Sequence, residues 1–170
     1  MKKIKITRGE FLNLWNTLKK VGSEQRNIKG AYAIAKNITH LKSEYDEIVG
    51  TRVVVPEYIK YEKERIKIAR STAILDGQGK PIIENNSFIP KDFDVFGEMI
   101  TALKEGHKKA IEEQTKLDKE YQDFLNEEID VEAYPIIFKY LPTTLDANTL
   151  VILMPIIDGD ELIKDEVFGN

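Results

Sequence analysis

Apolar residues in the second half of the chain recur at alternating steps of three and four. This is the a/d spacing of a coiled coil, held for more than four heptads, and it predicts one long helix over residues 93–127. Gly106 inside the pattern indicates a close helix contact or a bend. The ladder consists of Phe93, Phe96, Ile100, Leu103, His107, Ala110, Gln114, Leu117, Tyr121 and Phe124, of which His107 and Gln114 are polar.

The first half of the chain has the helical period as well. It predicts a helix over 8–21 that ends at Gly22, a second helix over 28–49, and a third over 56–75. The β-branched run at 51–55, followed by proline, predicts a break or a short strand between the second and third helices. The second helix has a heptad ladder of its own, formed by Ala31, Ile34, Ile38, Leu41, Tyr45 and Ile48.

The period changes at two places, which adds β-structure to the prediction. Residues 76–92 combine turn signals with two short apolar runs, so we expect a turn and a small hairpin there, with Asp92 as the cap of the long helix. From Ile129 the apolar pattern predicts one or two strands, and Thr144 is expected to cap a short helix over 145–154.

These elements predict a mainly α fold with a minor β part (α+β), in which long antiparallel coiled-coil-like helices accompany a small hairpin and a C-terminal strand. The length predicts a single domain over 1–170. Whether the seams close within one chain, as an antiparallel hairpin, or between the chains of a homo-oligomer stays open. The expected parts are a helical part (8–75), a turn and hairpin (76–92), the long helix (93–127), a strand and short helix (128–157) and an acidic tail (158–170).

Charge is unevenly placed along the chain. Residues 1–29 hold eight Lys/Arg against two Glu, whereas residues 121–170 hold eleven Asp/Glu against two Lys. This asymmetry predicts that ends of opposite sign meet, within a subunit or between subunits, unless both are simply solvated surfaces. The net charge of −4 makes the chain a poor match for nucleic acid, because phosphate attraction needs a clustered basic face.

Several function classes find no support in the sequence. There is no apolar run of about 18 residues, so we expect no membrane-spanning helix. The absence of cysteine excludes disulfides and thiolate zinc sites. His107 lacks the Glu-x-x-His spacing of a metal ligand, and residues 76–80 lack the ligands of a calcium loop and the spacing of a phosphate loop. We therefore expect neither an enzyme nor a cofactor nor a metal site.

The strongest candidate for a ligand surface lies in the third predicted helix, where Tyr58 and Tyr61 stand among basic residues such as Lys63. Arg65 falls near the apolar stripe, and a charge there needs an anionic partner. The favoured interpretation is an internal salt bridge to a carboxylate such as Glu44 or Glu98. The alternative is a phosphate, which the planar guanidinium group fits well.

Three further positions complete the candidate site. Lys36 and Asn37 face away from most of the second helix's ladder, and we expect them to line the same cleft. His107 is either a ligand contact or a polar seam residue that specifies helix pairing, and the second interpretation is favoured.

Three segments occur in an order that resembles a group of small, largely uncharacterised proteins encoded by tailed phages and prophages. They are residues 31–38, residues 61–69 leading into 76–81, and residues 127–131 with 139–142. The resemblance covers most of residues 28–157 and contains no catalytic signature. It implies a phage origin and a small accessory protein, located in the cytoplasm of the bacterial host or in the virion.

Two functional hypotheses follow. The first is a non-catalytic, homo-oligomeric counter-defence protein that sequesters a host immune signalling nucleotide, a small anionic ligand, with Tyr61 and Arg65 in pockets between subunits. The second is a virion, adaptor or assembly (scaffold) protein that binds phage structural proteins and no small molecule. The tyrosine–arginine cluster favours the first hypothesis slightly. That preference disappears if Arg65 pairs internally with a glutamate.

Overall fold

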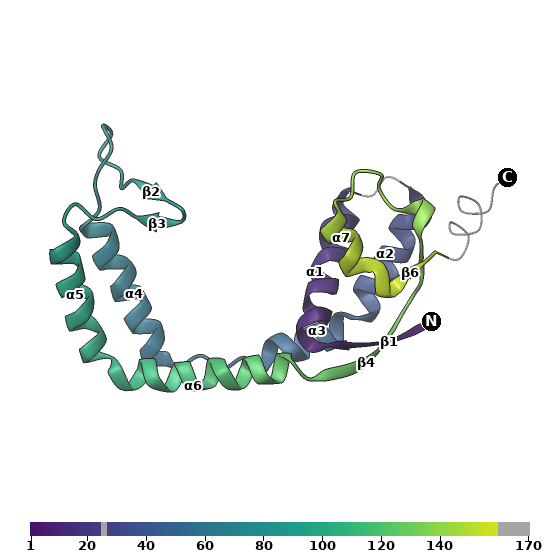
Figure 1. Cartoon of the computed structure of the whole chain (residues 1–170), viewed down its shortest axis with the longest axis horizontal. Helices are drawn as coiled ribbons and strands as arrows, with labels where there is room; N and C mark the ends of the chain where they lie inside the picture. Colours follow the sequence, from purple (N-terminus) through teal and green to yellow (C-terminus); the bar gives the residue numbers. More distant parts are fainter. Residues whose placement is uncertain (25–26, 160–170) are drawn as a thin grey trace. The chain divides into compact units, whose positions relative to one another are not determined.

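The computed structural model describes residues 1–24 and 27–159, which are mainly helical with three two-stranded sheets (Figure 1). The α+β class is therefore confirmed. The chain forms two compact units where length alone predicted one domain. We call residues 1–52 with the described residues from 121 onward the terminal unit, and residues 53–120 the central unit.

The terminal unit contains both described ends of the chain. Its elements are β1 (Lys2–Thr7), α1 (Arg8–Glu24), α2 (Ile28–His40), α3 (Lys42–Gly50), β4 (Glu128–Ala133), β5 (Ile136–Ile137), a 3₁₀ turn at Phe138–Tyr140, α7 (Ala147–Leu153), a second 3₁₀ turn at Met154–Ile156 and β6 (Ile157–Asp158). The acidic tail was predicted from 158, and its residues 160–170 lie outside the described part.

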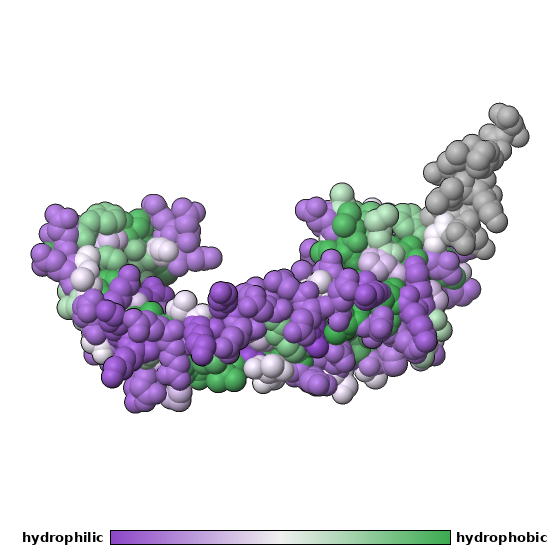
Figure 2. Space-filling view, turned by 60° about the horizontal axis from the view of Figure 1, so that its bottom comes forward, coloured by the Kyte–Doolittle hydropathy of each residue, from purple (hydrophilic) through white to green (hydrophobic). Residues whose placement is uncertain are grey.

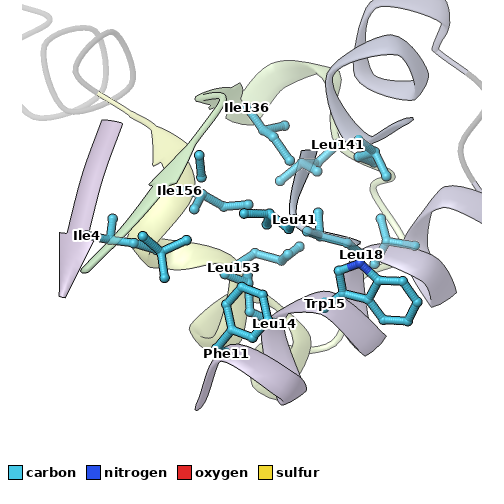
Figure 3. Close-up of a cluster of buried hydrophobic side chains, with 14 of the residues drawn as sticks. Ile4, Phe11, Leu14, Trp15, Leu18, Leu41, Ile136, Leu141, Leu153 and Ile156 are labelled. Carbon is cyan, nitrogen blue, oxygen red and sulfur yellow. The ribbon is translucent and has the colours of Figure 1, made fainter. Parts of the chain in front are cut away.

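Helix α1 supplies the centre of the terminal unit's core. Its stripe of Phe11, Leu14, Trp15, Leu18 and Val21 is buried, as the spacing predicted. Side chains from α7 and the C-terminal segment meet this stripe, among them Leu153 and Ile156 (Figure 3). Gly22 does not end the helix: a Cβ there would lie 3.2 Å from Ile34 Cγ2, so the glycine allows α1 and α2 to approach closely.

The basic N-terminus forms a strand that the sequence analysis missed. Strand β1 pairs antiparallel with β4, which places Lys3 opposite Glu132 and Lys5 opposite Asp130. Lys5 Nζ lies 2.6 Å from Glu128 Oε2, and Arg8 pairs with Glu127 at 2.5 Å. The prediction that segments of opposite charge meet is confirmed here within one chain.

Two helices that were predicted to be continuous are interrupted. The predicted helix 28–49 divides at Leu41 into α2 and α3, and the predicted helix 93–127 divides at His107. The bend suggested by Gly106 is confirmed, whereas the single long helix is wrong. The heptad ladder therefore runs along two helices, and no coiled coil over its whole length is seen in the described residues.

The central unit contains α4 (Pro56–Ser71), β2 (Ile83–Glu84), β3 (Ser87–Phe88), α5 (Phe93–Gly106) and most of α6 (Lys108–Leu125), whose last residues belong to the terminal unit. Helix α4 stops at Ser71, four residues before the predicted end. The predicted hairpin is confirmed, with Asn85 and Asn86 both at positive φ, as in a tight two-residue turn. Asp92 caps α5 through bonds from the backbone N–H of Asp94 and Val95.

The segment between α3 and α4 is a break without a strand. Gln114 of α6 holds it: its Oε1 accepts from the N–H of Val55 at 2.8 Å, and its Nε2 donates to Asp118 at 3.1 Å. This explains the polar residue in the heptad ladder, because Gln114 is buried and uses its amide to bind backbone.

The C-terminal elements differ in detail from the prediction. Asp146, not Thr144, caps the short helix α7. Strand β6 pairs in parallel with β5, with Ile136 opposite Ile157. No helix in the described part of the chain combines the length and apolar character needed to cross a bilayer.

Candidate functional site

The aromatic cluster predicted on the third helix forms in the central unit. The ring of Tyr61 lies 5.6 Å from that of Tyr58 and 5.8 Å from that of His107, measured between centroids. Tyr61 is only 5% exposed, so it packs between α4 and the start of α6 and offers little surface to a ligand. Burial, followed by the charge of Glu62, raises the pKa of Tyr58.

His107 lies beside this cluster at the break between α5 and α6. Its Nε2 is 3.4 Å from Glu64 Oε2, and its ring packs near Tyr61. These contacts come from the facing helix α4, which fits the interpretation of a polar residue in the seam.

Arg65 is paired within its own helix. Its Nε lies 3.0 Å from Glu62 Oε1, and its Nη2 lies 2.8 Å from Glu62 Oε2. These hydrogen bonds hold the pKa of Arg65 above its ordinary value. The favoured internal salt bridge is confirmed, but the predicted partners Glu44 and Glu98 are wrong, because Glu62 one turn earlier is within reach. The reason for preferring nucleotide sequestration is therefore gone.

Lys36 and Asn37 belong to the terminal unit, whereas Tyr58, Tyr61, Lys63, Arg65 and His107 belong to the central unit. Asn37 is fully buried and bonded to the backbone of Tyr134, so it has a structural role and does not line an open cleft. Lys36 is exposed and lies over the ring of Tyr134 at 4.2 Å.

The exposed side of α4 shows a second pattern that the sequence analysis used only in part. Ile59, Lys63, Ile66 and Arg70 follow one another at steps of four, three and four, so they share one face of the helix. All four are exposed. Among the described residues, neither Lys63 nor Arg70 has a carboxylate within ion-pair distance.

Helix α5 carries a matching exposed face, on which Val95, Met99 and Ala102 are again separated by steps of four and three. Glu98 and Glu105 flank these residues, and in the described chain neither has an ion-pair partner. No residue of α5 is buried, although the helix has 14 residues and a clear apolar side. Sequence reasoning missed this face because it followed the heptad ladder, which lies on another side of the same helix.

The described residues show neither of two features that are common at catalytic sites. They contain no group of three His, Asp or Glu side chains placed to hold a metal ion. No buried side-chain nitrogen or oxygen in that part of the chain is left without a hydrogen-bond partner. Comparison with protein families, with curated proteins and with solved structures gave no match.

Proposed function

We propose that this chain is a non-catalytic phage assembly or adaptor protein that associates with further copies of itself through the outer faces of α4 and α5. The observation that carries the proposal is the exposed apolar face of α5, flanked by acidic residues, together with the exposed apolar face of α4, interspersed with basic ones. The phage origin comes from the sequence resemblance and is part of the proposal.

The central unit buries few apolar side chains. Its buried apolar residues are Val55, Tyr61, Ala73, Pro90 and Ala110. Ten large apolar side chains of the same unit stay exposed, and in Figure 2 apolar surface in green appears between the charged residues. Short helices draw most of their stability from burying an apolar face, so a partner that covers these residues would stabilise the unit. The ten are Val53, Val54, Ile59, Ile66, Ile74, Leu75, Ile83, Phe93, Val95 and Met99.

A second copy of the chain fits this surface by charge. The outer face of α4 carries Lys63 and Arg70, and that of α5 carries Glu98 and Glu105. When α4 of one copy packs against α5 of another, apolar side chains meet, and the basic residues of α4 can pair with the acidic residues of α5. The central unit of each copy then carries both of the faces that the contact needs.

This proposal favours the assembly hypothesis over nucleotide sequestration. The sequestration hypothesis relied on Arg65 as a free phosphate ligand, and Arg65 is held by Glu62. An assembly protein needs no turnover and no small ligand, which agrees with the absence of catalytic spacing in the sequence.

Charge reversal tests the proposal. The variant Lys63→Glu/Arg70→Glu should sediment as a smaller species than the wild type while keeping its helical circular dichroism. Adding Glu98→Lys/Glu105→Lys should restore the larger species, because the charges are again opposite. Ile28→Glu is the control, since it adds a negative charge at an exposed apolar residue of the terminal unit and should leave the sedimenting species unchanged.

Two results would overturn the proposal. One is a wild type that stays monomeric over the whole accessible concentration range, whether or not it captures other phage proteins. The other is an oligomer whose subunit number, measured by native mass spectrometry, does not respond to the charge reversals.

A further inference from the structure

The exposed side of α2 in the terminal unit forms a hollow of about 460 Å³. It is lined by Tyr32, Ala35, Lys36, Thr39, His40 and Tyr134. Its volume lies in the range of small-molecule sites, about 300–1,000 Å³. None of the lining residues is acidic, so the hollow combines two tyrosine rings with a lysine and a histidine.

Lys36 is placed between the two tyrosines. Its ammonium nitrogen is 4.2 Å from the ring centre of Tyr134 and 5.6 Å from that of Tyr32. Within residues 1–24 and 27–159 it has no carboxylate partner, so its charge is available to an anion. Tyr32 is 65% exposed, an unusual degree for a ring of that size.

Contacts with α2 fix the position of Tyr134 at the side of the hollow. Asn37, the residue after Lys36, is buried, and its side chain binds both the N–H and the carbonyl oxygen of Tyr134 at 2.8 Å. The ring of His40 meets Tyr134 edge-on, with 5.6 Å between centroids. The aromatic wall is thus positioned before any ligand arrives, which lowers the entropy cost of binding.

We propose that this hollow binds a planar ring compound that carries a negative charge, of the size of a mononucleotide. The flat ring would lie against Tyr32 or Tyr134, and the anionic group would bind Lys36, with His40 and the hydroxyl of Thr39 beside it. Arginine and lysine with aromatic rings hold bases and phosphates together in this way. The inference goes beyond the proposed assembly function and uses only residues of the terminal unit.

The test is a titration of the whole chain with AMP. Binding is measured by calorimetry, and the residues involved are identified from the shifts of backbone amide NMR signals. Adenosine supplies the ring without the charge, and inorganic phosphate the charge without the ring. We expect AMP to bind, both fragments to bind more weakly, and the shifted amides to lie at the hollow. No binding of AMP up to about 1 mM, or shifts confined to other surfaces, would overturn the proposal.

Two substitutions separate binding from folding. Lys36→Met should weaken AMP binding at least about tenfold. Lys19→Met is the matched control, because Lys19 also lies over a ring, 4.9 Å from that of Trp15, in the same unit. Tyr134→Phe should retain binding and Tyr134→Leu should lose it. Equal binding by the Lys36 and Lys19 variants would show that Lys36 merely packs on tyrosine and would refute the site.

Discussion

The side chain of Asn37 binds the backbone of Tyr134 twice: its Nδ2 donates to the carbonyl oxygen at 2.8 Å, and its Oδ1 accepts from the N–H at 2.8 Å. The same Nδ2 also donates to Ala33 in its own helix at 3.1 Å. Residues 97 positions apart are joined in this way. The backbone groups of Tyr134, in the connection between β4 and β5, are therefore satisfied by a side chain of α2 instead of by a neighbouring strand.

Replacing Asn37 by alanine should destabilise the terminal unit by about 1–3 kcal/mol, because two partly buried backbone groups of Tyr134 lose their partner. The free energy of unfolding is measured by urea titration at one protein concentration. Asn16→Ala, at an exposed position of α1, is the control and should change stability by less than about 0.5 kcal/mol. Equal effects from the two variants would contradict the structural role assigned to Asn37.

Acid should remove a stabilising interaction at the start of α7. The backbone N–H and then the hydroxyl of Thr149 donate to Asp146 and lower its pKa below the ordinary value. The ionised carboxylate is therefore favoured in the folded state. Its contribution is complete above the unfolded pKa of about 4, and it is lost as the pH falls through the folded pKa.

The variant Asp146→Asn keeps a capping oxygen but cannot ionise. The wild type should exceed it in stability near pH 6, and the difference should shrink steadily as the pH falls below about 4. Urea midpoints of both proteins, measured across this range, provide the test. A difference that stays constant with pH would show that the charge of Asp146 contributes nothing.

The buried stripes of the helices were predictable because the apolar residues of a buried face recur at the helical period within one segment of sequence. The five buried residues of α1 occupy the positions that a 3.6-residue period assigns to one face. Local chemistry also revealed the start of α4 at Pro56 and the cap at Asp92, since both depend on residues within one turn. The helix interruptions at Leu41 and His107 were harder to predict from the sequence, because a heptad pattern continues across each of them.

Strand β1 escaped prediction for a different reason. Lys3, Ile4, Lys5 and Ile6 alternate in the way a strand does, but the run is short and rich in lysine. Its meaning appears only beside the alternating Glu128–Val131 segment, whose acidic residues face the lysines in the antiparallel register. Such a pairing between two segments far apart in the sequence depends on tertiary structure.

The candidate site illustrates the same limit. The sequence pointed correctly to an internal partner for Arg65, and Glu62 could have been found from its i−3 spacing. The buried position of Asn37 could not have been predicted from the sequence, because its partner Tyr134 lies far away along the chain. Likewise, the exposure of α5 follows from the few side chains that cover it and not from its own apolar pattern.

Substitution of Gly106 tests what causes the break between α5 and α6. No atom outside its helix lies within 4 Å of a Cβ built on Gly106, and its φ is not positive. Gly106→Ala should therefore stabilise the protein by about 0.5–1 kcal/mol, by removing backbone freedom from the unfolded chain. Gly79→Ala is the opposite control: at φ +77 it should destabilise by about 1–2 kcal/mol. Urea unfolding of both variants at one protein concentration gives the comparison.

A destabilised Gly106 variant would mean that the break between α5 and α6 requires glycine itself. A stabilised one would mean that the break is set by His107 and its contacts with Tyr61 and Glu64.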